Sequence, residues 1–179
     1  MSPLPVPLQL LLLTLALIAA IWDVVTRRIP NWLVLAGLAA ALMLQTWIQG
    51  WAGLGQAAMG FGLGFLVFFP IFLLQGKGGG DVKLMAAIGA ITGPKNVFLI
   101  FLLTAILGGV MAVGLLLLRG GWRRTFSNIA HIVGSLCRWQ LPSQQRPELS
   151  LDHPASVKLP YAVPIAAGSF LFLLLSRSG

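Results

Sequence analysis

The sequence predicts an all-α integral membrane protein that crosses the bilayer about six times, with its N-terminus outside. Of the 179 residues, 58% are hydrophobic and only 9% are charged, whereas a soluble domain carries about 25% charged residues. The apolar residues gather in long runs, and the basic residues gather at the ends of those runs. This pattern excludes a soluble domain, and it assigns the net charge of +8 to contact with a lipid bilayer rather than with nucleic acid.

Six apolar segments have roughly the length that a membrane helix needs, which is about 20 residues. No Lys or Arg precedes the first of them, so we expect a retained helix rather than a cleaved signal peptide. The segments cover residues 5–22, 32–48, 54–74, 82–93, 97–118 and 159–175.

The fourth and fifth segments lie in one continuous apolar stretch that is too long for a single pass. Thr92-Gly93-Pro94-Lys95-Asn96 interrupts it, because Gly and Pro break helices and the last two residues prefer water. We therefore predict a hairpin. Its first arm, 82–93, is only about 12 residues or about 18 Å long, which suggests a thinned membrane or a water-filled approach.

The distribution of charge supports this topology. The chain has 12 Lys and Arg residues. With six passes and the N-terminus outside, only Lys95 and Arg177 lie outside, and the others lie on the cytoplasmic side. We predict one membrane domain over 1–179 in a bacterial inner membrane, with a basic cytoplasmic loop at 119–158. Asp23 and Asp81 then both lie at the cytoplasmic face.

Asp23 is one of only four acidic residues, and it closes the first apolar run. A carboxylate at membrane depth is energetically costly and marks a candidate functional site. Arg28, Pro30 and Asn31 follow it, where Pro30 fixes a turn and Asn31 can cap the next helix. The simpler interpretation is a cytoplasmic connector in which Asp23 pairs with an arginine.

Asp81 follows a glycine cluster, Gly76-Lys77-Gly78-Gly79-Gly80, and opens the next apolar run with Lys83 close behind. Successive glycines permit positive φ and close approach of another segment, and a helix start favours a carboxylate. The simpler interpretation is a flexible loop with a capping aspartate. A phosphate-binding loop is disfavoured, since the Lys-Ser/Thr ending is missing.

The two carboxylates together indicate a specific chemistry. When two such groups are close, one tends to stay protonated while the other is charged. An aspartyl protease uses the charged group to take a proton from water and the neutral one to polarise a peptide carbonyl. Two alternatives stay open: a small transporter or channel with Asp23 and Asp81 as ion sites, and a secretion-machine subunit that binds a partner through 119–158.

Four stretches of sequence resemble one family. GGGD fits the Gly-x-Gly-Asp motif of membrane aspartyl proteases, and with DVVTRRIPN, DVKLMAAIGA and LPYAVPIAAG the chain resembles the type IV prepilin peptidases from Asp23 to Gly168. The resemblance implies catalytic roles for Asp23 and Asp81. It implies that prepilin-like substrates lose a short basic leader after a glycine, at the cytoplasmic face. The residues that would support the motifs are Arg28, Pro30, Asn31, Gly78, Gly80 and Lys83.

One departure from the family pattern narrows this expectation. Long members carry an additional cytoplasmic domain with paired CxxC motifs and also N-methylate the new terminus. Here the single cysteine, Cys137, allows no CxxC pair, and only Thr26 to Asn31 separate the first two helices. The chain therefore looks like the short Flp/Tad-type members. We expect leader cleavage without methylation, without a metal and without a cofactor.

Overall fold

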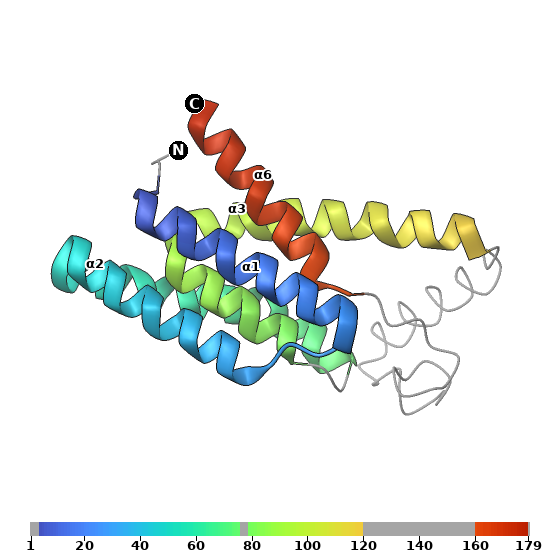
Figure 1. Cartoon of the computed structure of the whole chain (residues 1–179), viewed down its shortest axis with the longest axis horizontal. Helices are drawn as coiled ribbons and strands as arrows, with labels where there is room; N and C mark the ends of the chain where they lie inside the picture. Colours follow the sequence, from blue (N-terminus) through green and yellow to red (C-terminus); the bar gives the residue numbers. More distant parts are fainter. Residues whose placement is uncertain (1–3, 76–78, 120–159, 179) are drawn as a thin grey trace.

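The computed structural model describes residues 4–75, 79–119 and 160–178 (Figure 1). These residues form four helices, which confirms the predicted all-α class: α1 (Val6–Thr26), α2 (Asn31–Gln75), α3 (Gly80–Arg119) and α6 (Ala162–Ser178). The first three contain spans long and apolar enough to cross a membrane, and α6 carries a shorter apolar segment. The predicted loop at 119–158 lies, beyond its first residue, outside the described residues.

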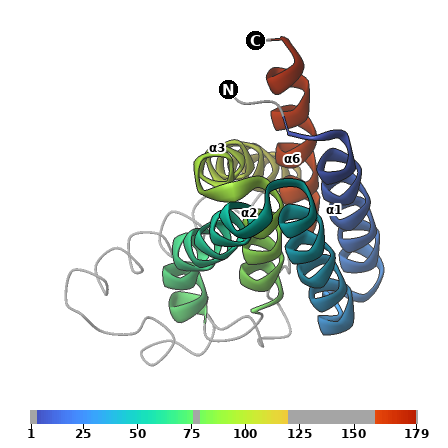
Figure 2. The same ribbon diagram turned by 90° about the vertical axis from the view of Figure 1, so that its left-hand side faces the viewer.

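Helix α2 folds back on itself at Gly50, whose φ of 60° and ψ of −143° are not helical. A Cβ atom on Gly53 would meet the backbone carbonyl of Gln45, although eight residues span about 12 Å in a continuous helix. The chain therefore reverses here, and the two arms diverge from the turn (Figure 2). They correspond to the predicted segments 32–48 and 54–74.

Helix α3 reverses in the same way at Gly93, which has a φ of 79° and a ψ of 170°. A Cβ atom on Gly89 would lie 3.3 Å from Cγ2 of Val97, so residues eight apart in sequence are in contact. The break predicted at Thr92–Asn96 is thus confirmed. The number of membrane crossings and the outside position of the N-terminus stay predictions.

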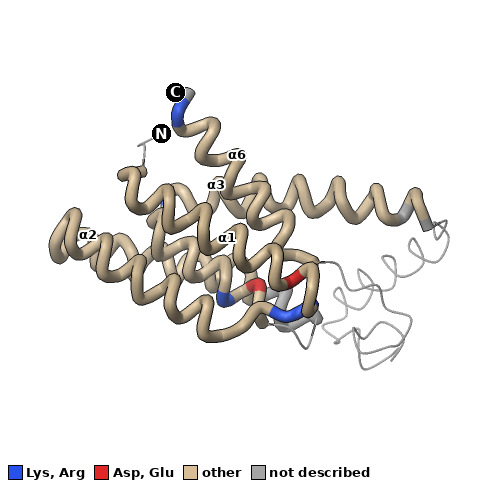
Figure 3. Tube along the Cα trace, in the orientation of Figure 1, with Lys and Arg blue, Asp and Glu red and all other residues tan. Residues whose placement is uncertain are grey.

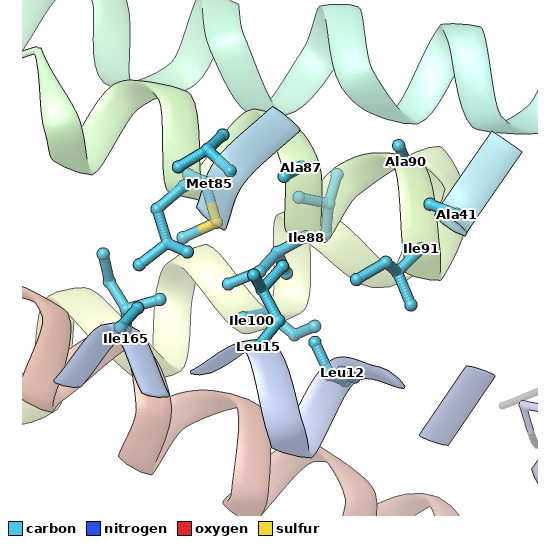
Figure 4. Packing of buried hydrophobic residues seen from close by; sticks show 14 of the residues in the cluster. Leu12, Leu15, Ala41, Met85, Ala87, Ile88, Ala90, Ile91, Ile100 and Ile165 are labelled. Atoms are coloured by element: carbon cyan, nitrogen blue, oxygen red, sulfur yellow. The ribbon is translucent and has the colours of Figure 1, made fainter. Parts of the chain in front are cut away.

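The first arm of α3 is the centre of the molecule. Leu84, Met85, Ile88 and Ile91 are fully buried in it, and side chains from the surrounding helices cover it (Figure 4). The arm is therefore surrounded by protein rather than by lipid. Its shortness needs neither a thinned membrane nor a water-filled approach, because the neighbouring helices shield it.

Close contact between α2 and α3 holds that arm in place. A Cβ atom on Gly60 would overlap the carbonyl oxygen of Gly89, and one on Gly64 would lie 2.5 Å from the carbonyl oxygen of Met85. Small residues spaced four apart are a common means of bringing two membrane helices together. The backbone that follows Asp81 is thereby fixed against the second arm of α2.

Tryptophans lie at both ends of the first arm of α2. Trp32 packs edge-on against Trp22 of α1, with ring centroids 5.9 Å apart. At the other end, Trp47 and Trp51 are 90% and 86% exposed. Since tryptophans gather at both interfaces of a bilayer, the two groups indicate where the membrane surfaces lie. The start of α2 and the end of α1 then share one interface.

Candidate active site

Three helix ends meet at one end of the bundle. The described acidic residues, Asp23 near the end of α1 and Asp81 in the first turn of α3, lie close together there, with basic residues beside them (Figure 3). The first turn of α6 joins them, because its backbone reaches Asp23. The tertiary fold therefore brings together two acids that are far apart in the sequence.

Asp23 is buried, with 7% of its surface exposed. Its Oδ2 accepts a hydrogen bond of 3.1 Å from the backbone N–H of Ala162. The first amides of a helix have no partner within that helix, so they are available to an anion. Here a carboxylate from α1 occupies that position at the N-terminus of α6.

The first turn of α6 forms around two prolines. The carbonyl of Pro160 accepts the N–H of Val163 at 3.1 Å, and the carbonyl of Tyr161 accepts the N–H of Ile165 at 3.3 Å. This leaves the amide of Ala162 directed to Asp23. No catalytic part was predicted for this segment, and its only signal in the sequence was the LPYAVPIAAG motif.

Asp81 is partly buried, and its carboxyl group interacts electrostatically with that of Asp23. It stands in the first turn of α3, where the helix dipole favours a negative charge. The predicted proximity of the two carboxylates is thus present in the fold. When two coupled carboxyl groups have unequal surroundings, one of them keeps a proton while the other is ionised.

Tyr161 is a further polar group at this end of the bundle, and it lies immediately before α6. Partial burial, and secondly the negative charge of Asp81, raise the pKa of its phenol above the ordinary 10.0. The phenol is therefore neutral at physiological pH and remains a hydrogen-bond donor. Tyr161 was not predicted to be a catalytic residue.

The connector between α1 and α2 is a tight turn. Arg27 ends α1 in the left-handed conformation, with a φ of 56°, and its N–H donates to the carbonyl of Asp23 at 2.8 Å. The hydroxyl of Thr26 lies 2.9 Å from the carbonyl of Arg28, and the carbonyl of Pro30 accepts the N–H of Leu33 at 3.2 Å. These bonds fix the backbone that follows Asp23.

The connector touches the start of α3. The side-chain oxygen of Asn31 accepts a hydrogen bond of 3.1 Å from Nζ of Lys83, and a Cβ atom on Gly80 would lie 3.3 Å from Cβ of Ile29. Asn31 is the first residue of α2, so the oxygen that we expected to cap this helix links it to α3 instead. The predicted supporting residue Gly78 lies outside the described residues.

The described residues contain no group of three His, Cys, Asp or Glu side chains that could hold a metal ion. What they do contain is a pair of interacting carboxyl groups, a backbone amide bonded to one of them, and a neutral phenol nearby. This set of groups suits proton transfer to and from a bound water.

Comparison with known proteins identifies relatives. The model of the type IV leader peptidase family matches residues 10–113. A prepilin leader peptidase/N-methyltransferase of Aeromonas hydrophila is 37% identical over 120 residues, which cover 63% of this chain and 41% of that protein. One of Bacillus subtilis (strain 168) is 30% identical over 169 residues, which cover 93% of this chain and 54% of that protein.

The chain thus spans about half of the length of these relatives, or less. No solved structure has significant similarity to it. The family model covers more than half of the chain, including Asp23, Asp81 and the turn between α1 and α2. The chain therefore belongs to the type IV leader peptidase family.

Proposed function

We propose that this protein is a membrane aspartyl endopeptidase that removes the short basic leader of prepilin-like subunits. The observation that carries the proposal is the interaction of Asp23 and Asp81 at one end of an apolar bundle. Family membership and the names of the relatives support the substrate class. The position of Trp22 and Trp32 beside Asp23 supports cleavage at a membrane surface.

The reaction needs only the two carboxyl groups and water. The ionised carboxylate takes a proton from water, and the water oxygen attacks the carbonyl carbon of the scissile peptide. The protonated carboxyl gives its proton to the carbonyl oxygen, which forms a tetrahedral diol. The C–N bond then breaks, the leaving amine takes the proton held by the first carboxylate, and a diol hydroxyl returns a proton to the second. Each group ends in its starting state.

We place the cut on the cytoplasmic side of the inner membrane. All of the Lys and Arg residues except Lys95 and Arg177 fall on the side of Asp23 and Asp81 when the predicted segments alternate across the bilayer. A pilin subunit whose apolar helix lies in the membrane would present its leader at that surface. Asp81 is partly exposed, so water would reach it from the same side.

We further propose that cleavage is not followed by N-methylation, and that the substrates are of the Flp type. The connector between the end of α1 and the start of α2 consists of four residues, Arg27 to Pro30. It leaves no room at that point for the CxxC domain that the family resemblance associates with methylating members. The mass of the mature pilin tests this, since a methyl group on the new N-terminus would contradict it.

The central experiment replaces each catalytic aspartate separately, Asp23→Asn and Asp81→Asn, in cells that also express a Flp-type prepilin. Removal of a general acid or base lowers a rate by about 10²–10⁴-fold, so we expect the precursor to accumulate. Asp152→Asn is a matched control that removes a carboxylate to which the mechanism gives no part, and it should process normally. Membrane-fraction blots establish equal amounts of each variant.

Unimpaired processing of the prepilin by either Asn variant would contradict the aspartyl mechanism. Equal loss in the Asp152→Asn control would show that the assay responds to charge in general. Restored activity on addition of zinc, after inhibition by a chelator, would point to a metalloenzyme instead.

A further inference from the structure

The two carboxyl groups of the dyad have unequal surroundings. Asp23 is buried and bonded to the Ala162 amide, whereas Asp81 is partly exposed. Within the described part of the chain, no backbone amide from another helix donates to Asp81. The inequality allows the two catalytic roles to be assigned to individual residues.

Two effects compete at Asp23. Burial disfavours the charged form of a carboxylate, while a hydrogen bond from a backbone amide favours it. The amide belongs to the first turn of a helix of 17 residues, and the dipole of such a helix adds to the attraction for a negative charge. The bond is also charge-assisted when Asp23 is ionised, which strengthens it further.

Among the residues that the structure describes, few other charged or titratable groups lie at this end. Asp81 also lies at a helix start, so the helix dipoles act on both acids, and the hydrogen bond from the Ala162 amide is what distinguishes Asp23. Asp81 interacts with Asp23, and a second negative charge there is disfavoured once Asp23 is ionised. Tyr161, next to Ala162, remains neutral. Lys83 on α3 is bonded to Asn31, and Arg27 and Arg28 follow α1 in the connector.

We propose that the first turn of α6 assigns the roles in the dyad: the Ala162 amide holds Asp23 as the ionised carboxylate that takes the proton from water, and Asp81 keeps the proton that polarises the peptide carbonyl. Oδ2 of Asp23 is engaged with the amide, which leaves the second oxygen for the water. Ala162 is thus a positioning residue that acts through its backbone. This inference rests on the proposed function.

The test removes the N–H of residue 162 without removing the helix. Proline is tolerated at the first helical position, where its missing N–H and fixed φ do little harm, and Ala162 is the first residue of α6. Ala162→Val is the matched control, because it retains the N–H while it adds a similar bulk at this fully buried position. The dependence of kcat/KM on pH is measured for both variants and for the wild type with one purified prepilin.

For Ala162→Pro we expect kcat to fall about tenfold or more, with KM within about twofold of the wild-type value. The acidic limb of the pH profile should move up by about one to two pH units, the worth of a hydrogen bond to a charged group. The alkaline limb should stay, since it reports the second proton of the dyad. Ala162→Val should keep both limbs at the wild-type pH.

A shift of the alkaline limb alone would overturn the assignment, because Asp23 would then hold the proton. Identical profiles in the proline and valine variants would show that the amide has no part, while inactive Asp23→Asn and Asp81→Asn enzymes would leave the proposed function intact. Active Asp23→Asn or Asp81→Asn variants would contradict the proposed function itself. If Ala162→Pro does not fold, an amide-to-ester replacement at position 162 removes the same N–H without adding a ring. The position of the acidic limb of its pH profile then tests the assignment.

Discussion

Gly64 on α2 controls the position of Asp81 through one close contact. A Cβ atom on Gly64 would lie 2.5 Å from the carbonyl oxygen of Met85, which is one helical turn beyond Asp81. Ordinary contacts of a Cβ atom begin at 3.4 Å, so Gly64→Ala must displace the α3 backbone by about 1 Å, because a close-packed interior has no free space for the added atom. The methyl group meets backbone, so no side chain can rotate away.

Two consequences are expected from Gly64→Ala. Overpacking lowers the free energy of unfolding by about 1–3 kcal/mol. A displacement of about 1 Å at a catalytic group lowers the rate by up to about 100-fold. Gly62→Ala, two residues away on the same helix, is the matched control, since nothing lies within 4 Å of its Cβ position. Both substitutions gain the same helix propensity, so their difference isolates the contact.

The assay combines thermal unfolding in detergent, followed by the fluorescence of the six tryptophans, with initial rates of leader cleavage. Gly64→Ala should unfold at a lower temperature and cleave more slowly than Gly62→Ala. If both variants behave alike in both measurements, then α2 and α3 do not approach as closely as described, and their contact does not position Asp81.

Two further predictions concern groups around the dyad. Tyr161 is the only tyrosine, so the ultraviolet absorbance of tyrosinate follows its titration directly. Because burial and the charge of Asp81 raise its pKa, the wild-type midpoint should lie above 10.0. In Asp81→Asn the midpoint should be lower than in the wild type but still above 10.0, since burial remains. An unchanged midpoint in that variant would place Tyr161 away from Asp81. The Lys83–Asn31 bond should give a coupling free energy of about 0.5–1 kcal/mol in a double-mutant cycle of Lys83→Met and Asn31→Ala, scored by cleavage rate. Strictly additive losses would show that the two residues act separately.

Much of the fold was predictable because it depends on local patterns. Apolar runs define the helices, and the chain reverses at Gly93, inside the Thr92–Asn96 break that Gly and Pro predicted. The burial of the first arm of α3 was not predictable. A fully buried helix and a lipid-facing helix are equally apolar, so hydropathy alone does not say which neighbours surround Leu84–Ile91.

The site was predictable in part for a related reason. Asp23 and Asp81 stand out because carboxylates are rare in so apolar a chain. The Ala162 amide has no such signal, since every residue except proline carries an N–H and the sequence does not show where it points. Asn31 was assigned to a helix cap from local spacing, whereas its oxygen is bonded to Lys83, 52 positions along the chain.

The sequence by itself determined that this chain is helical, that it belongs in a membrane, and that two aspartates lie at the ends of apolar runs. These properties depend on composition and on neighbours along the chain. Only the tertiary structure decided that the aspartates interact, that the start of α6 reaches Asp23, and that Tyr161 lies within the field of Asp81. Such contacts depend on how helices pack, through glycines that admit a neighbouring backbone, and helix packing joins residues that have no relation in sequence.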